Sequence, residues 1–316
     1  MDQASKITGD TQDTSAFATL GVVVIGRNDG LRLVGCFDSL PATPTVYVDS
    51  GSTDGSIEVA RQRRIDVVEL DLSIPFTAAR ARNAGFAQLL WTHPHLEYVQ
   101  FVDGDCQLVP GWLTSALAFL EAKPDVAAVC GRLRERYPDR SVYNWLCDRE
   151  WDRPTGQVRS CAGNVMMRAA ALKSVGGYRE DVIAGEEGEL CVRLRYASWR
   201  IWRLADEMAL HDAAMFHFGQ WWRRACRAGY SFAQGSHLHG ASPERHLVRE
   251  THRAAVWGLL LPIACFTASI AFPGVGWVMW LLYFMQFARL TINNAGSPSE
   301  RARLAFFQLL GRFPEG

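Results

Sequence analysis

Short apolar runs and amphipathic segments alternate along the first half of the chain. The earliest run, Leu20 to Ile25, reads LGVVVI, a continuous β-branched stretch of the buried-strand type that ends at the turn GRNDG. Three further runs predict strands, at 45–48, 66–70 and 98–102. Segments with helical spacing separate these strands, at 31–40, 56–64 and 80–91. The alternation predicts a parallel, doubly wound α/β sheet, in which ligands bind beyond the carboxyl ends of the strands.

The pattern changes after residue 130. Residues 131–156 are polar and aromatic, which predicts a loop-rich substrate surface. The segment CAGNVMMR predicts a strand that leads to a helix at AALKSVGG. In GEEGELCVRLR, Leu190 and Leu194 share one helical face, while Glu189 and Arg193 are spaced to pair at i,i+4 on another.

Residues 254–292 form the most apolar stretch of the chain, with the single charge Arg289 near its end. Pro273-Gly274 divides the stretch into halves of roughly 18–19 residues, each about the length that crosses a hydrocarbon core. Basic residues lie on both outer flanks and none lies at the Pro-Gly turn, which favours a transmembrane hairpin with both ends cytoplasmic. A pair of buried helices and a re-entrant hairpin that does not cross are the alternatives.

Five segments are therefore expected along the chain. Residues 1–19 are polar and small, which predicts a disordered leader. An α/β domain over 20–224 is followed by an interfacial or linker helix over 225–253, beginning within the aromatic and basic run WWRRACRAGY. That run suits either an interface helix or contact with lipid headgroups. The hairpin over 254–292 precedes an amphipathic tail over 293–316 that is suited to a membrane surface.

Overall composition excludes a general attraction to nucleic acid. The chain of 316 residues has 33 basic and 33 acidic residues, so a charged partner must be bound locally. Its eight cysteines show neither CxxC pairs nor zinc-like spacing, and no secretory signal is visible. Both features favour reduced thiols in a cytosolic compartment.

Polar clusters follow three of the predicted strands. GRNDG carries Gly26 and Arg27, DSGSTDGS carries Asp49, Ser52 and Asp54, and DGD comprises Asp103, Gly104 and Asp105. Neither GxxxxGK[ST] nor GxGxxG occurs, so a P-loop NTPase and a dinucleotide-binding fold are not supported. Carboxylates and hydroxyls in DSGSTDGS suit a base edge and ribose hydroxyls, although helix capping alone would explain Asp54.

The DGD triplet has the chemistry of a divalent-cation site. Two carboxylates in this spacing can share a hard ion such as Mg²⁺ or Mn²⁺ with a phosphate oxygen, and Gly104 allows a ligand to approach the backbone. His211 is our first choice for a further metal ligand and His217 the second. A solvated Asp-Gly-Asp turn is the alternative.

Glu186 and Glu187 stand at a predicted helix start, where the helix dipole favours ionised carboxylates. An ionised carboxylate there can take a proton from a hydroxyl nucleophile. An ordinary acidic first turn would look the same.

Together these motifs resemble glycosyltransferase family 2, inverting enzymes of the GT-A fold that use a nucleotide-sugar donor. The correspondence runs from about Leu20 to Arg224, with the first strand, VDSGSTDGS, ARNAGF, FVDGDC, CAGNVMMR and GEEGELCVRLR in family order. The resemblance implies an α/β fold: a GT-A, Rossmann-like nucleotide-diphospho-sugar transferase domain followed by the C-terminal hydrophobic hairpin. It also implies metal-dependent transfer of a sugar to an acceptor hydroxyl.

The resemblance assigns roles to individual residues. Asp49 is implied to contact the nucleoside, and Asp103 and Asp105 to hold the metal and the diphosphate. Arg80 is implied near the donor phosphates with Asn83 in support. Glu187 corresponds to the catalytic base, with Glu186 beside it.

The sequence departs from the family pattern at three places. Ser50 replaces the second carboxylate of the usual Asp-Asp pair at the nucleoside site, and the base is Glu instead of Asp. The Q-x-x-R-W signature of processive synthases is only echoed by Gln220 to Arg224, which favours a single transfer over polymerisation.

The hairpin bears on the acceptor and the location. It predicts a catalytic domain held on the cytoplasmic side of the inner membrane, acting on a lipid-linked, cell-envelope or exopolysaccharide glycan. A non-catalytic scaffold of a polysaccharide assembly complex is one alternative. A sugar nucleotidyltransferase is another, although GRNDGLRL lacks the glycine-rich basic loop of such enzymes.

Overall fold

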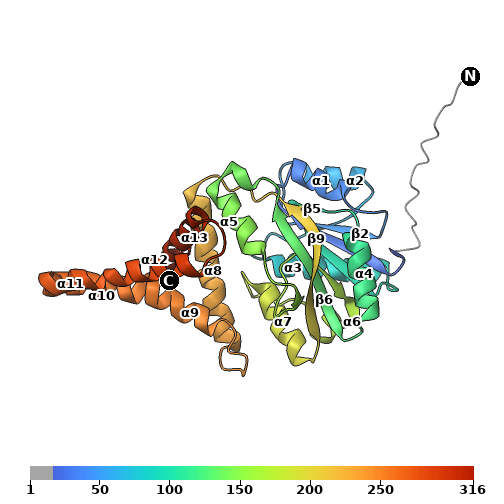
Figure 1. Cartoon of the computed structure of the whole chain (residues 1–316). Helices are drawn as coiled ribbons and strands as arrows, with labels where there is room; N and C mark the ends of the chain where they lie inside the picture. Colours follow the sequence, from blue (N-terminus) through green and yellow to red (C-terminus); the bar gives the residue numbers. More distant parts are fainter. Residues whose placement is uncertain (1–16) are drawn as a thin grey trace, which may run out of the picture.

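A computed structural model describes residues 17–316, so most of the leader expected at 1–19 lies outside the described residues. The chain forms an α/β domain around one sheet and a helical extension that projects from it (Figure 1). The sheet has nine strands in the order β3-β2-β1-β4-β8-β6-β9-β5, with β7 pairing on β9.

The first half of the sheet follows the predicted alternation of strands and helices. Its elements are β1 (Leu20–Gly26), α1 (Leu31–Asp38), β2 (Thr45–Asp49), α2 (Ser56–Gln62), β3 (Asp66–Glu69), α3 (Ala78–Thr92) and β4 (Tyr98–Asp103). Strands β3, β2, β1 and β4 are parallel, and their apolar residues form much of the core. In this register Gly26 is opposite Asp49, and Ile25 is opposite Asp103. Three of the predicted polar clusters therefore meet at one edge of the sheet.

The second half of the sheet is mixed, where the pattern predicts parallel strands. Its elements are β5 (Cys106–Leu108), α4 (Trp112–Ala122), β6 (Val126–Glu135), η2 (Pro138–Arg140), α5 (Val142–Trp151), β7 (Gly156–Gln157), β8 (Val165–Arg168), α6 (Ala169–Ser174), α7 (Glu186–Tyr196) and β9 (Arg200–His211). β8 runs antiparallel to both β4 and β6, and β5 runs antiparallel to β9. β5 starts after only Gly104 and Asp105, too few residues for the crossover that a parallel neighbour of β4 requires.

Residues 131–156 are more ordered than the loop-rich surface that their polarity predicts. β6 continues to Glu135 because burial alternates along it, with Leu133 and Glu135 buried and Arg134 exposed. The charged Glu135 on its buried face hides the period of two that marks a strand. α5 then begins at a proper cap, since the Ser141 hydroxyl accepts a hydrogen bond from the N–H of Asn144 (3.0 Å).

The helical extension contains the remaining elements. They are α8 (Phe218–His239), α9 (Val248–Ala254), the π-helical η3 (Ala255–Leu260), α10 (Leu261–Ala271), α11 (Pro273–Met279), α12 (Leu281–Asn293), α13 (Pro298–Leu310) and α14 (Arg312–Glu315). α10 and α11 form the far end of the projecting arm in Figure 1. α13 and α14 return to α8, where the rings of Trp221 and Phe307 lie 5.3 Å apart.

The predicted hairpin is present as a chain reversal at Phe272, but its two arms differ. α9, η3 and α10 form one continuous helix over Val248–Ala271, the one helix among residues 17–316 that is long and apolar enough to cross a membrane. The returning arm is divided at Trp280 into α11 and α12. Most of the large apolar side chains that the described residues expose lie between 256 and 292.

Candidate active site

The turns after β1 and β2 are joined by hydrogen bonds at the carboxyl edge of the sheet. Asp49 is buried, and its Oδ2 accepts from the N–H groups of Gly51 and Ser52 (2.8 Å each). The Ser52 hydroxyl accepts from the N–H of Asn28 (3.0 Å), and Asp54 accepts from the N–H of Gly30 (2.9 Å). The predicted residues Asp49, Ser52 and Asp54 thus order the two turns beside Gly26 and the exposed Arg27. Ser50, at the position of the family's second carboxylate, has a buried hydroxyl without a hydrogen-bond partner among the described residues.

The two aspartates of DGD face different partners. Asp103 Oδ1 accepts from Arg82 Nη2 (2.9 Å), and Asp103 Oδ2 accepts from Asn164 Nδ2 (3.2 Å). Asp105 Oδ2 lies 3.3 Å from His211 Nε2 and 3.8 Å from Arg32 Nη1. Burial raises the pKa of Asp103 despite the charge of Arg82. Burial acts in the same direction on Asp105, but the hydrogen bond and charge of His211 outweigh it and lower the pKa of that carboxyl.

Asp105, Cys106 and His211 form a cluster whose potential ligand atoms all lie within 4.8 Å of one another. β5 and β9 bring them together, since Cys106 is opposite His211 in the register. Burial alone lowers the pKa of His211, but the carboxylates of Asp105 and Glu135, at 3.3 and 3.8 Å, raise it to about 9. Burial raises the pKa of the Cys106 thiol well above its usual value, so this sulfur is a poor ligand at neutral pH.

A carboxylate oxygen and an imidazole nitrogen 3.3 Å apart suit a divalent ion of the Mn²⁺ or Mg²⁺ class. Because the raised pKa leaves His211 protonated at neutral pH, such an ion would have to displace that proton to bind the imidazole. Of the predicted metal ligands, Asp105 and His211 are thus brought together, while the Asp103 oxygens point to Arg82 and Asn164. His217 is exposed at the N-cap of α8 and lies outside the cluster.

Arg82 connects the DGD end of β4 with the acidic start of α7. The buried guanidinium places Nη2 2.9 Å from Asp103 Oδ1 and Nη1 2.6 Å from Glu186 Oε1. Glu187 Oε1 lies 3.5 Å from the same Nη1. Gly163 makes room for this bridge, because a Cβ at that position would lie 2.1 Å from Nη2.

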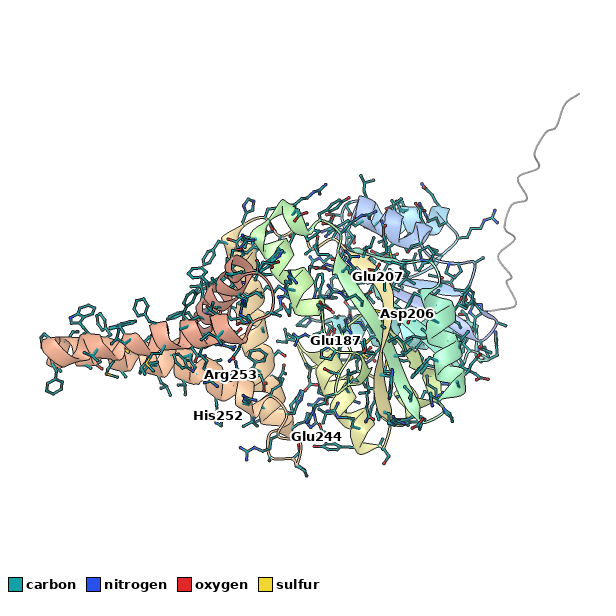
Figure 2. The ribbon with its side chains drawn as sticks, in the orientation of Figure 1. Glu187, Asp206, Glu207, Glu244, His252 and Arg253 are labelled. Atoms are coloured by element: carbon teal, nitrogen blue, oxygen red, sulfur yellow. The ribbon has the colours of Figure 1, made fainter. Side chains whose placement is uncertain are left out.

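Glu187 has the protonation behaviour of a general base. It lies in the first turn of α7, beside the central sheet (Figure 2). Burial and the neighbouring charge of Glu186 raise its pKa to about 7, against the opposing charge of Arg82. A carboxyl with this pKa takes up and releases a proton near neutral pH.

The predicted phosphate residues of α3 lie elsewhere. Arg80 donates to the carbonyls of Ile74 (2.9 Å) and Asp71 (2.7 Å), so it orders the loop before the helix. Asn83 donates to the carbonyl of Tyr178 (2.8 Å) and accepts from its N–H (2.9 Å).

Sequence reasoning missed Arg82, although a signal was present. It shares the buried helix face of Ala79, Phe86 and Leu89, and residues two apart such as Arg80 and Arg82 point about 200° apart around a helix. An arginine within an apolar stripe requires buried acids to pair with it.

Asp29 and Glu135 were also missed. Asp29 Oδ2 would lie 2.7 Å from a Cβ at Gly104, so it stands beside the DGD turn. Burial and the charge of Asp105 raise the pKa of Asp29 to about 6. Glu135 Oε2 lies 3.8 Å from Nδ1 of His211. Asp29 belongs to GRNDG, a cluster already expected at a strand end, whereas no motif distinguished Glu135, which only the folded sheet brings to the site.

Comparison with known proteins agrees with this architecture. The sequence profile described as glycosyl transferase family 2 matches residues 22–172. No curated protein matches the sequence.

Two solved structures share the fold. The mannosyltransferase PcManGT from Pyrobaculum calidifontis, in complex with GDP-Man and Mn²⁺, has a TM-score of 0.60 at 18% identity, over 93% of this chain and 85% of that chain. TarS of S. aureus has a TM-score of 0.51 at 17% identity, over 75% of this chain. The match spans only 43% of the TarS chain.

Proposed function

Residues 22–172 belong to glycosyl transferase family 2 and the chain is a glycosyltransferase; from that premise we propose that it moves a sugar from a nucleotide-diphosphate donor to an acceptor hydroxyl with inversion. The observation that carries the proposal is the Arg82 bridge. One guanidinium contacts Asp103 on the donor side and Glu186 and Glu187 at the start of α7. The bridge thereby fixes the position of the donor site relative to the base, as a direct displacement requires.

The donor nucleotide is proposed to bind at the carboxyl edge of β1, β2 and β4. The ordered turns of Gly26, Arg27, Asp49, Ser52 and Asp54 provide polar groups for the nucleoside. Arg80 and Asn83 take part indirectly, by ordering the loops at the two sides of α3. Ser50 has a hydroxyl in place of a second carboxylate, but that hydroxyl is buried, so recognition of the base is proposed to depend on the exposed groups of the two turns.

Asp105 and His211 are proposed to hold a divalent metal, with Asp103 and Gly104 next to them. When bound, such an ion neutralises the diphosphate that leaves with the nucleotide. Arg82 pairs with Asp103, and Arg32 lies 3.8 Å from Asp105. Glu135 faces Nδ1 of His211, the ring nitrogen that does not face Asp105, and so helps to orient the imidazole. PcManGT, which shares the fold, was solved with GDP-Man and Mn²⁺.

Glu187 is proposed as the base that removes the proton of the acceptor hydroxyl. The hydroxyl oxygen attacks the anomeric carbon, the bond from that carbon to the diphosphate breaks, and Glu187 retains the proton. Attack from the face opposite the leaving group inverts the configuration. Glu186 contacts Arg82 at 2.6 Å, and its charge, together with burial, raises the pKa of Glu187 to about 7.

The exposed apolar surface of α10 to α12 supports insertion into a membrane, because water-facing apolar surface of that extent is unfavourable. The basic flanks of the hairpin support a catalytic domain on the cytoplasmic side of the inner membrane. We therefore propose a lipid-linked or cell-envelope glycan as the acceptor.

Turnover of the donor tests the proposed base. Without an identified acceptor, water can take its place, and the measured product is the nucleoside diphosphate released from UDP-, GDP- and dTDP-sugars. Glu187→Gln should lower the rate by about 10²–10⁴-fold with donor binding unchanged. Because the base acts only when ionised, wild-type kcat/KM should rise with pH through about 7.

Glu207→Gln is the matched control, since Glu207 is exposed on β9 and pairs only with Arg134 (2.7 Å) among the described residues. Its rate and pH profile should equal those of the wild type. A Glu187→Gln variant as fast as the wild type would remove Glu187 from the mechanism.

A further inference from the structure

A groove on the helical extension lies apart from the catalytic residues. It encloses about 500 Å³ beside the start of α9. Arg245, Arg249, His252 and Arg253 line its polar side, and Val256 and Trp257 line its apolar end. Figure 2 shows His252 and Arg253 on the extension, separate from Glu187 on the α/β domain.

The protein neutralises the positive charge of this groove only in part. Arg245, Arg249 and Arg253 form no salt bridge with any residue between 17 and 316. Of the acids close to them in the fold, Glu244 pairs with Arg159 and Arg195, and Glu315 pairs with Arg312. Glu250, in the first turn of α9, acts on Arg253 through its charge, but one acid does not balance three arginines. Arg249 and Arg253 are four residues apart on a helix, a spacing at which like charges repel. A bound anion would relieve this repulsion.

The groove also stands where charged surface gives way to apolar surface. From Ala254 to Ala271 the helix carries no charge, and Leu259, Leu260 and Ile263 are exposed directly beyond the groove. Trp257 lies at this boundary, a position that tryptophan favours at membrane surfaces. The π-helical turn Ala255–Leu260 falls at the same place, and such turns often mark functional sites.

We propose that this groove binds the phosphate of an anionic membrane lipid, whose acyl chains lie along the exposed face of α10. Arg249 and Arg253 donate hydrogen bonds to the phosphate oxygens, because the planar guanidinium matches that geometry. Arg245 approaches from the turn before α9, and Trp257 packs beside the upper part of the acyl chains. The inference rests on the membrane placement of the proposed function and adds a specific lipid-phosphate site to it.

Native mass spectrometry of the full chain in a non-ionic detergent tests the site, with phosphatidylglycerol and phosphatidylcholine titrated separately. The wild type should bind one phosphatidylglycerol in clear preference to phosphatidylcholine. Arg249→Gln/Arg253→Gln should weaken phosphatidylglycerol binding roughly 30-fold, from about 1 kcal/mol for each arginine near a lipid surface. Its affinity for phosphatidylcholine should not change.

Lys123→Gln/Lys173→Gln is the matched control, because it removes two exposed charges near α4 and α6, on the far side of the sheet from the extension (Figure 1). It should bind phosphatidylglycerol as the wild type does. An arginine variant that keeps the wild-type preference would overturn the proposal. So would inorganic phosphate that displaces phosphatidylglycerol at an equal concentration, because the groove would then serve a soluble anion.

Nucleotide binding separates this inference from the proposed function. The arginine variant should bind the donor nucleotide as the wild type does, since its substitutions lie outside the site at β1, β2 and β4. Loss of lipid preference with nucleotide binding intact supports the groove alone. Lipid binding without any nucleotide binding by the wild type would instead contradict the proposed function.

Discussion

At the residue scale, the site depends on one buried cation among three carboxylates. Arg82 contacts Asp103, Glu186 and Glu187, and its Cζ lies 5.6 Å from the centre of the Tyr178 ring. One positive charge cannot balance three negative charges, so one carboxyl is held near its protonation midpoint. The pKa of about 7 at Glu187 is the consequence that matters for catalysis.

Arg82→Met should therefore destabilise the fold strongly. Removing one partner of a buried ion pair typically costs about 3–5 kcal/mol, because the remaining charge is left uncompensated. The free energy of unfolding, measured by urea titration in detergent, should fall by that amount. Arg82→Met/Glu186→Gln should recover part of the loss, since it leaves one buried charge fewer.

Arg80→Met provides the control within the same helix. Its guanidinium bonds only two exposed carbonyls among the described residues, so the loss should stay near 1 kcal/mol. Equal losses for Arg80→Met and Arg82→Met would contradict the bridging role.

The sequence predicted the candidate acids of this site better than its cation. DGD and GEE were recognisable as motifs because their spacing along the chain is the signal. Which of Arg80 and Arg82 faces the site depends on how α3 is rotated about its axis against the sheet, and packing decides that rotation. Asp29 and Glu135 come from separate elements, and only the register of the folded sheet brings them near Asp105 and His211.

At the scale of elements, the close approach of α10 and α11 defines the tip of the hairpin. A Cβ on Gly276 would lie 2.3 Å from backbone atoms of Ala268 and Ser269, so the two helices touch along their backbones. Gly274, two residues earlier, faces open space. The two glycines of one short helix thus differ in what an added methyl group would meet.

Gly276→Ala should lower the melting temperature of the purified protein in detergent, because overpacking forces the helices apart at a cost of about 1–3 kcal/mol. Gly274→Ala should leave the melting temperature unchanged or raise it, since alanine favours a helix where space is free. Equal effects of the two substitutions would show that the hairpin is not packed as described.

Strands and helices whose apolar residues follow a clear pattern were predicted from the sequence, while those in which this pattern is interrupted were not. β1, β2 and β4 are mostly apolar and buried, and α3 buries one face, so each was recognisable. β6 was hidden by the charged Glu135 on its buried face, and the antiparallel strands β5 and β8 depend on pairings distant in sequence. Period and composition do not carry that pairing information.

At the scale of the whole molecule, the α/β domain and the extension have different surfaces. Large apolar side chains between residues 256 and 292 face outward, with Ile270, Trp277 and Phe284 each at least 65% exposed. Burying such side chains among lipid acyl chains is favourable, whereas exposing them to water is not. Deleting the whole C-terminal region would confuse this test, because α13 packs on α8 through Phe307 and Trp221.

Point substitutions test the membrane role without removing that packing. Ile270→Gln/Trp277→Gln/Phe284→Gln should shift the protein from the membrane fraction toward the soluble fraction after cell lysis and centrifugation. The matched control replaces three equally exposed apolar residues of the α/β domain, Leu31, Leu72 and Trp91, with Gln. A hairpin variant that fractionates like the wild type would argue against insertion.

The most direct test of the account is calorimetric titration of UDP, GDP and dTDP, each with and without Mn²⁺, into wild type, Asp105→Ala and Asp206→Asn. Asp206 is exposed on β9, the strand that carries His211, and so controls for the lost charge. The account predicts metal-dependent binding of one nucleotide by the wild type and Asp206→Asn, and its loss in Asp105→Ala. Folded wild-type protein that binds none of the three nucleotides, or an Asp105→Ala variant that binds as well as the wild type, would contradict a donor site built on Asp105.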